Sequence, residues 1–122
     1  MTDNLMISKM GKLRIYITAG EKIRSEKLLH KVFPKSKYLK ILQEAKTSGI
    51  INAHVFKTHA SMQNGGNITH NLVDGNTSAL VFCIELIDER IKLETFFSTH
   101  KNILQKNIVE YKEVEFWKYE NV

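Results

Sequence analysis

The sequence predicts an α+β domain in which two helices cover one face of a four-stranded antiparallel sheet. The hydrophobic pattern changes along the chain between a period of two and a period near 3.6, in the order strand, helix, strand, strand, helix, strand. This βαββαβ order is the split βαβ, or ferredoxin-like, arrangement. A chain of 122 residues is also long enough for one hydrophobic core and too short for two.

The N-terminal segment, residues 1–11, has no periodicity, and we expect it to form a flexible arm. One domain then spans residues 12–120. The first strand is predicted over residues 12–18, where apolar side chains alternate with polar or aromatic ones. These apolar residues are Leu13, Ile15 and Ile17.

The first helix of the fold is predicted over residues 36–48, before Gly49, which stands where a left-handed C-terminal cap belongs. Its apolar face follows the i, i+3, i+4, i+7 rule. That face consists of Tyr38, Ile41, Leu42 and Ala45. The preceding segment leaves two interpretations open: a short helix capped by Ser25 and closed by Pro34, or a partly ordered loop.

The second and third strands are predicted over residues 50–60 and 77–87, and a polar segment of Asn, Gly, Ser, Thr and Asp joins them over residues 61–76. A tight hairpin would need only a few connecting residues. Connections as long as this one are usually functional or disordered. We therefore expect the loop to contact a ligand or a partner.

The second helix is predicted to begin after Asp88, a suitable N-cap residue, and to pack one apolar stripe on the sheet. The stripe contains Leu93, Phe96, Phe97, His100, Ile103 and Leu104. The last strand is predicted over residues 108–119. With both helices on one face, the other face of the sheet has no cover, although Tyr16 and Phe56 make it partly apolar. Such a face indicates an oligomer or a flat binding surface.

Composition places the chain in a reducing compartment, and we expect it to be cytoplasmic. Cys83 is the only cysteine, so no internal disulfide can form. No apolar run approaches the ~20 residues that cross a bilayer, and the N-terminus does not resemble a secretory signal. The net charge of +5 comes from lysines spread from Lys9 to Lys118, which favours a solvated surface over a nucleic-acid patch.

Catalytic and metal-binding patterns are missing from the sequence, so we expect neither an enzyme nor a metal site. His54 and His59 are five apart on one predicted strand, which places them on opposite faces. They cannot share a metal within one subunit, and His30, His70 and His100 add no recognised ligand spacing. Cys83 lies within an apolar strand and is expected to be a core residue rather than a nucleophile.

A glycine pair in the long loop gives a moderate indication of anion binding. Successive backbone amides around Gly65 and Gly66 could hold an anion, and Asn67 follows them. Lys57 and His59, at the end of the preceding strand, could add positive charge toward a phosphate. The segment does not match the Walker pattern, and the simpler interpretation is a flexible loop.

Single-stranded RNA is the alternative ligand for the open sheet face. RNA-recognition motifs share the βαββαβ topology and stack bases on aromatic residues of the central strands. The third strand here reads SALVFCIEL and lacks the aromatic signature of that class, and Phe82 alone is better explained as a core residue. Nucleic acid is therefore not the expected partner.

Four segments taken in order resemble the PII-like family catalogued as domain of unknown function 190. The strand Leu13 to Ile17 resembles the opening of that family, and residues 35–57 resemble its helix and second strand. Tyr38, Ala45, Gly49, Ala53, Val55 and Lys57 are the corresponding positions of that second segment. Asp88, Glu89 and Ile91 resemble the start of its second helix. Val114, Glu115, Lys118 and Tyr119 resemble its last strand.

The resemblance implies a homotrimer in which the uncovered sheet faces turn inward, and a small ligand, often an adenine nucleotide, in the clefts between subunits. It further implies that residues 61–76 form a T-loop that engages a membrane transporter or an enzyme. The candidate ligand-binding residues are then Lys57, His59, Gly65, Gly66, Asn67, Lys118 and Tyr119. A trimeric metal-tolerance or scaffold protein of similar shape is a further alternative, and it would need histidines that converge across subunits.

Two departures from the family pattern concern this ligand site. Family members usually carry glycines after the basic residue of the second strand and before the loop, whereas this chain has Thr58, His59, Ala60 and Ser61. Residues 21–34 also resemble an insertion. The ligand site is therefore the part of the family pattern that this chain matches least.

Overall fold

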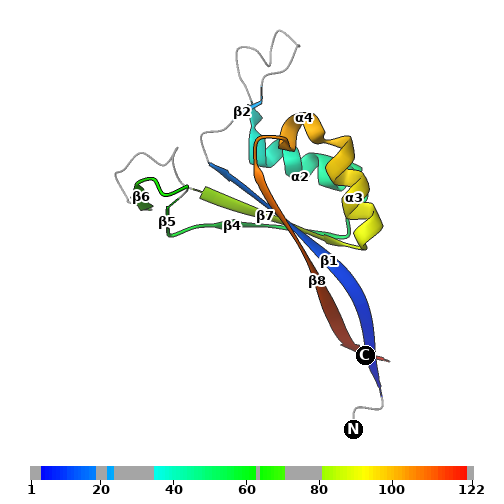
Figure 1. Cartoon of the computed structure of the whole chain (residues 1–122). Coiled ribbons are helices and arrows are strands. Elements are labelled where there is room, and N and C mark those ends of the chain that lie inside the picture. The colour runs from blue at the N-terminus through cyan, green and yellow to red at the C-terminus, as the bar shows by residue number, and fades with distance from the viewer. Residues whose placement is uncertain (1–3, 19–21, 24–34, 63, 71–80, 121–122) are drawn as a thin grey trace.

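The computed structural model describes residues 4–18, 22–23, 35–62, 64–70 and 81–120 (Figure 1). In chain order its elements are β1 (Leu5–Thr18), β2 (Lys22–Ile23), β3 (Lys35–Ser36), α2 (Lys37–Thr47), β4 (Asn52–Lys57), β5 (Ala60–Met62), β6 (Ile68–His70), β7 (Val81–Asp88), α3 (Arg90–Thr99), α4 (Lys101–Leu104) and β8 (Ile108–Tyr119). The helix considered between Ser25 and Pro34, and the start of the predicted third strand, residues 77–80, lie outside the described residues.

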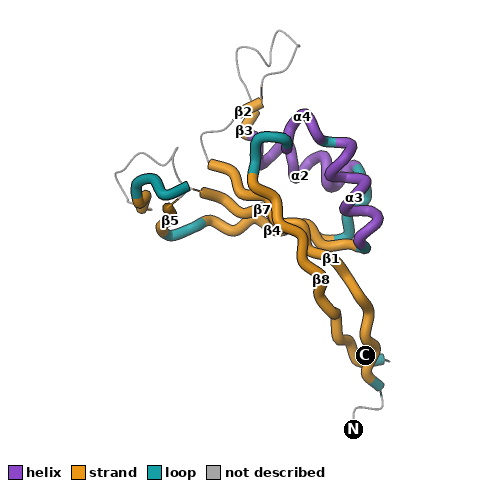
Figure 2. The backbone as a smooth tube through the Cα atoms, viewed as in Figure 1, coloured by secondary structure: helices purple, strands orange, loops and turns teal. Residues whose placement is uncertain are grey.

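The main sheet has the strand order β4-β7-β1-β8, and each neighbouring pair is antiparallel. The helices lie together on one face of this sheet, as Figure 2 shows. The predicted α+β, ferredoxin-like architecture is therefore confirmed. Two small sheets stand beside it, one formed by β2 with β3 and one by β5 with β6.

The core lies between the helices and the covered face of the sheet. Leu13, Ile15 and Ile17 alternate along β1 and are all buried, as the period of two predicts. Their direct neighbours on β7 include Ile84 and Leu86, which are also buried. The helices complete the cluster with Ile41, Ala45, Leu93, Phe96 and Leu104.

Helix α2, Lys37–Thr47, confirms the helix predicted over residues 36–48. Its buried residues and the glycine after its C-terminal end are those that the sequence indicated. Ile41 and Ala45 are buried on the face toward the sheet. Gly49 has a φ of 77°, a left-handed conformation that glycine adopts without steric cost. The Ile50 amide donates to the Ala45 carbonyl at 3.0 Å, and this bond satisfies a carbonyl at the end of the helix.

The N-terminal arm is the first correction to the sequence analysis. Residues 5–11, predicted to be flexible, belong to β1 and pair with the end of β8 from Leu5 opposite Tyr119 to Gly11 opposite Glu113. The polar and apolar residues of this stretch do not alternate, so its strand conformation depends on pairing with β8 rather than on its own pattern. Residues 1–3 lie outside the described residues.

Asp88 is not the N-cap of the following helix. It is the last residue of β7, and Glu89 occupies the cap position of α3. The Asp88 carboxylate instead accepts hydrogen bonds from the amides of Glu89, at 2.7 Å, and Ile51, at 3.0 Å. It also contacts the Lys92 ammonium at 2.9 Å. Asp88 therefore joins β7, α3 and the connection between α2 and β4.

The long loop contains structure of its own. The second predicted strand ends at Lys57, and Ala60–Met62 pairs with Ile68–His70 as a small hairpin. At the base of the hairpin, both the amide and the hydroxyl of Thr58 donate to the Val81 carbonyl, at 3.0 and 2.7 Å. The predicted loop thus contains strand residues at 61–62 and 68–70, whereas residues 63 and 71–76 lie outside the described part of the chain.

The second helix and the last strand differ in how well the sequence predicted them. The helix breaks at His100 into α3 and α4, and Phe97 of the predicted buried stripe is 44% exposed. The strand β8 has the predicted bounds, residues 108–119. It is an edge strand of the main sheet and pairs only with β1 among the described strands. Its second half lies opposite the part of β1 that precedes Gly11, where the pairing of β1 with β7 begins.

Candidate functional site

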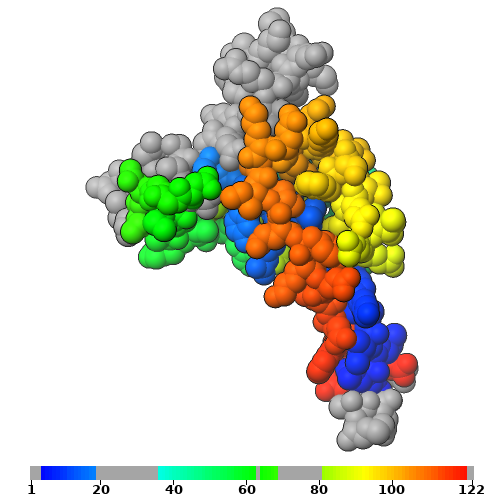
Figure 3. Space-filling model, in the orientation of Figure 1, coloured from blue at the N-terminus to red at the C-terminus, as the bar shows by residue number. Residues whose placement is uncertain are grey.

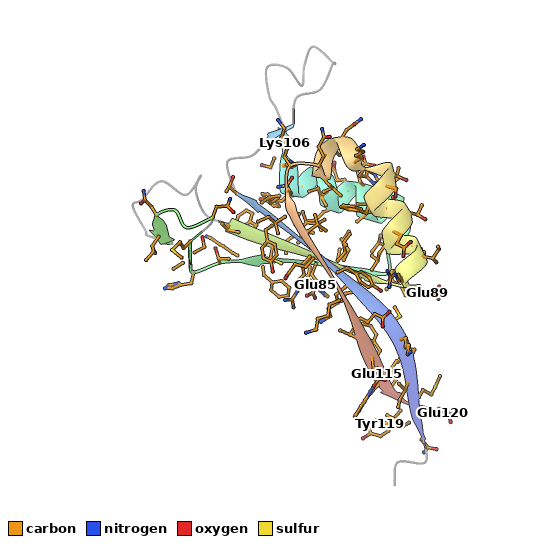
Figure 4. The ribbon with its side chains drawn as sticks, viewed as in Figure 1. Glu85, Glu89, Lys106, Glu115, Tyr119 and Glu120 are labelled. Atoms are coloured by element: carbon orange, nitrogen blue, oxygen red, sulfur yellow. The ribbon has the colours of Figure 1, made fainter. Side chains whose placement is uncertain are left out.

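The uncovered face of the sheet carries a buried carboxylate surrounded by basic side chains. Glu85 lies at the centre of this face (Figure 4) and is buried, and its carboxylate accepts a hydrogen bond from Arg14 Nε at 2.9 Å. Lys12 Nζ and His54 Nδ1 lie 3.8 and 3.9 Å from the same carboxylate. Phe56, on the neighbouring strand, is 52% exposed beside His54. The open face therefore carries both an exposed apolar ring, that of Phe56, and a cluster in which basic side chains surround the Glu85 carboxylate.

A second polar pair on this face involves Tyr16. Its hydroxyl donates a hydrogen bond to Glu110 Oε1 at 2.5 Å. This hydrogen bond, with burial, raises the pKa of Tyr16 to about 12, because ionisation would place a phenolate against the Glu110 carboxylate. Cys83 lies directly opposite Tyr16, and burial raises the pKa of its thiol. A thiol held protonated in this way is a poor nucleophile.

A polar hollow opens at the end of the β1–β8 pair, beside the hairpin of β5 and β6. It has a volume of about 260 Å³. The residues that line it are Tyr16, Ile17, Thr18, Asn64, Lys106, Asn107 and Ile108. The amide of Asn107 donates to the Tyr16 carbonyl at 3.1 Å, which fixes one wall of the hollow to β1. An ammonium, two amides and a hydroxyl together form a suitable lining for a small anion.

The hairpin turn places Asn64 at this hollow. Asn64 and Gly65 have φ values of 50° and 70°, so two successive residues adopt the left-handed conformation and turn the chain sharply. A Cβ added at Gly65 would meet nothing within 4 Å, so its requirement for glycine is conformational rather than steric. Gly66 and Asn67 complete the turn and are exposed.

The predicted ligand-binding residues occupy two distant regions of one chain. Lys57 and His59 lie at the base of the hairpin, are exposed, and do not line the polar hollow. Lys118 and Tyr119 lie at the far end of β8, and Figure 4 shows Tyr119 there. Lys118 is ten residues beyond Ile108 on the same strand, roughly 33 Å at about 3.3 Å per residue. The fold of a single chain therefore does not bring the two groups together.

Lys106 is the cation that the sequence analysis missed. It lies in the connection between α4 and β8 (Figure 4), and it is an exposed residue that lines the hollow. In the sequence it is one of many scattered lysines, and only the fold brings it close to Asn64, which is 42 positions earlier in the chain. The one local signal is the Lys106-Asn107 pair, two polar residues between a helix and a strand, which is typical of any such connection.

Metal binding and membrane insertion have no support among the described residues. Within the described ranges, no group of three or more His, Cys, Asp and Glu side chains could hold a metal ion. None of the helices in that part of the chain has the length and hydropathy needed to cross a bilayer.

Comparison with solved structures identifies the fold. CPII from Thiomonas intermedia K12, a nitrogen regulatory PII-like protein bound to ADP, AMP and bicarbonate, is similar with a TM-score of 0.59 at 10% identity, over 91% of each chain. The apo form of CPII has a TM-score of 0.56 at 9% identity, over 93% of this chain and 98% of CPII. A protein from Thermus thermophilus assigned to PII-like signaling has a TM-score of 0.55 at 10% identity, over 93% of this chain and 92% of that protein.

Sequence comparison identifies the family. No curated protein matches the chain. The family model described as Uncharacterized ACR, DUF190, matches residues 10–116. This range begins before the first predicted strand and ends within the last one, so it includes both helices, the hairpin and the polar hollow. The chain belongs to the DUF190 family and has the fold of PII-like proteins.

Proposed function

We propose that this protein is a non-enzymatic PII-like regulator that acts in the cytoplasm as a homotrimer. It binds a small anionic effector, with an adenine nucleotide as the first candidate, in clefts between subunits. The observation that carries the proposal is the polar hollow that joins Lys106 to the hairpin of the long connecting segment. A ligand in this hollow contacts both the rigid sheet and the hairpin, so its binding can change the conformation of the segment.

Support for the effector class comes from the lining of the hollow and from CPII. Lys106 provides a positive charge, and Asn64, Asn107 and Thr18 provide uncharged polar groups at the same hollow. Such a set suits phosphate or carboxylate oxygens. CPII, which shares the fold, is bound to ADP, AMP and bicarbonate. We therefore extend a nucleotide or a small carboxylate to this chain as the effector class.

Support for a site between subunits comes from the separation of the candidate residues. Lys118 and Tyr119 lie roughly 33 Å along β8 from the hollow of their own chain. They can join Lys57, His59 and Lys106 in one cleft only when they come from a second chain. The open face, with Phe56 exposed, supplies a surface that assembly would cover.

Regulation is proposed to pass through residues 61–76, which would engage a membrane transporter or an enzyme. The ligand acts as a switch only if it binds one conformation of this segment more tightly than another. Asn64 gives the ligand a direct contact with the segment. The hydrogen bonds of Thr58 to Val81 hold the base of the hairpin to the sheet, so movement is confined to its outer part.

The test combines light scattering with thermal denaturation in the presence of ATP, ADP, AMP, cyclic nucleotides and bicarbonate. A ligand at about 100 times its Kd adds about 2.7 kcal/mol to the stability of the native state, which is a readily measured rise in melting temperature. Lys106→Gln should weaken binding of the active ligand about tenfold or more, since a hydrogen bond to a charged group is lost. Lys101→Gln is the matched control, because Lys101 is exposed on α4 outside the hollow.

The proposal predicts a trimer whose melting temperature rises with one of these ligands, and a rise that Lys106→Gln reduces while Lys101→Gln does not. A trimer whose melting temperature rises equally in both variants would indicate that the effector binds outside the hollow. A monomer that ignores all the ligands and binds single-stranded RNA would favour the alternative function of the open face, with Phe56 and Tyr16 as the base-stacking residues.

A further inference from the structure

We propose that the arm of one chain docks into an apolar groove on a second copy of the same chain, with Trp117 as the anchoring side chain. The arm is defined as residues 5–10 of β1 and 114–119 of β8. The groove is the hollow between α3 and β8 that is lined by Leu13, Arg90, Leu93, Glu94, Phe97, Val109 and Tyr111. The groove shares no lining residue with the polar hollow.

The arm projects from the body and exposes apolar side chains that no other described element covers. Figures 1 and 3 show it extending beyond the sheet and helices, with the strand ends at its tip. Ile7 lies directly opposite Trp117 and is 54% exposed, while Trp117 is 66% exposed. Tyr119 is exposed on the same face of the ribbon, and Met6 is exposed on the opposite face. An isolated two-stranded ribbon is only marginally stable in water, so a further contact would stabilise it.

The groove has the size and character to receive such a side chain. Its volume is about 380 Å³, and its lining includes Phe97, which is 44% exposed although the sequence predicted it to be buried. Gly11 shapes the groove, since a Cβ there would lie 2.7 Å from Tyr111 Cε1 and 2.9 Å from Leu93 Cδ1. The missing side chain of Gly11 thus lets the Tyr111 ring lie against the backbone of β1.

Charges at the groove and at the arm tip are complementary. Arg90 borders the groove, with its guanidinium 5.0 Å from the centre of the Tyr111 ring and ion pairs to Glu94 at 2.7 Å and Glu113 at 3.7 Å. At the tip, the indole of Trp117 donates to Glu115 Oε1 at 3.0 Å, so the anchor carries a carboxylate beside it. That carboxylate suits Arg90 at the groove.

The arm cannot reach the groove of its own chain. Val109 lines the groove and Trp117 lies at the tip, both on β8, eight residues or roughly 26 Å apart along one extended strand. Folding back would break the ladder that pairs β1 with β8 without interruption from Leu5 to Tyr16. A second copy supplies the tip without this cost. Buried aromatic residues of this kind commonly dominate the energetics of an interface.

The chain contains a single tryptophan, so intrinsic fluorescence reports the environment of Trp117 alone. The measurement is its emission maximum and its quenching by acrylamide in the full-length protein, at a concentration where light scattering shows association. A peptide of residues 113–120 provides the value for a fully exposed indole. Docking predicts emission at shorter wavelength than the peptide and strong protection from quenching.

Phe97→Glu places a charge in the groove, and Phe97→Ala is a milder second variant if the first one fails to fold by circular dichroism. Both should remove the protection of Trp117, so that its quenching matches that of the peptide. Ile91→Glu is the matched control, since Ile91 is exposed on the same helix and outside the groove. It should leave the quenching of Trp117 unchanged.

Two results would overturn the proposal. One is a Trp117 that is quenched like the peptide in the associated wild-type protein. The other is a protected Trp117 whose quenching is the same in Phe97→Ala and Phe97→Glu as in wild type, which would place the arm against another surface. Neither result bears on the effector, because the response to nucleotides and bicarbonate is measured separately through Lys106.

Discussion

Replacing Asp88 by alanine removes one buried carboxylate that joins three parts of the fold. The side chain is 4% exposed and contacts Lys92 Nζ at 2.9 Å, the Ile51 amide at 3.0 Å and the Glu89 amide at 2.7 Å. A hydrogen bond that involves a charged group contributes about 1.5–3 kcal/mol. Because Ile51 and Lys92 are partly exposed, water replaces some of the lost contacts. We therefore expect the free energy of unfolding to fall by about 3 kcal/mol.

The pH dependence of this effect has a defined sign. Burial raises the pKa of Asp88, but the Lys92 ammonium and the two amide donors outweigh it, so the pKa in the folded protein lies below its usual value. A depressed pKa contributes stability above the unfolded pKa of about 3.9, and that stability is lost as pH falls through the folded pKa. The stability difference between wild type and Asp88→Asn should therefore be full at pH 7 and shrink below about pH 4.

The assay is urea unfolding followed by far-ultraviolet circular dichroism at a fixed protein concentration, since association would add to the apparent stability. Asp88→Asn keeps the volume and one acceptor, so we expect a loss of about 1–2 kcal/mol. Glu89→Gln, an exposed neighbour, should change stability by less than about 0.5 kcal/mol. A loss below about 0.5 kcal/mol in Asp88→Ala, or a loss independent of pH, would refute the reasoning.

Three other predictions concern a side-chain hydrogen bond, a glycine in a turn and a buried residue of the core. Glu110→Gln should lower the pKa of Tyr16 from about 12 toward 10, seen as the disappearance of one late step in the tyrosinate absorbance titration. Gly65→Ala forces a side chain into a left-handed position and should cost about 1 kcal/mol locally, measured as faster hydrogen exchange in β5 and β6, whereas Gly66→Ala should not. Ile41→Ala opens a cavity in the core and should lower the free energy of unfolding by about 2–5 kcal/mol in urea.

Local periodicity in the sequence was sufficient for most of the fold. The alternation of Leu13, Ile15 and Ile17 defined the central strand, and the spacing of Ile41 and Ala45 with Gly49 defined α2. These signals succeed because the period of a helix or strand depends only on residues that are close together in the sequence. The order of these elements predicted the ferredoxin-like architecture. It also predicted that one face of the sheet has no helix to cover it.

The candidate site was less predictable, because its residues are distant in the sequence. Asn64 of the hairpin and Lys106 beyond α4 line one hollow, and no local pattern distinguishes Lys106 from the other lysines. The predicted residues Lys57, His59, Lys118 and Tyr119 remain predictions. They lie in two distant regions of one chain, so they can share a cleft only at an interface between two chains.

The sequence by itself determined the main strands and helices, their order, and most of the apolar residues that they bury. Only the tertiary structure decided that residues 5–11 extend β1, that Asp88 joins three elements instead of capping one, and that Phe97 faces a groove. Each of these depends on a partner far along the chain: β8 for the arm, Ile51 for Asp88, and Tyr111 for the groove. A local pattern reports burial and period, whereas the identity of the partner is set by the way the chain folds back on itself.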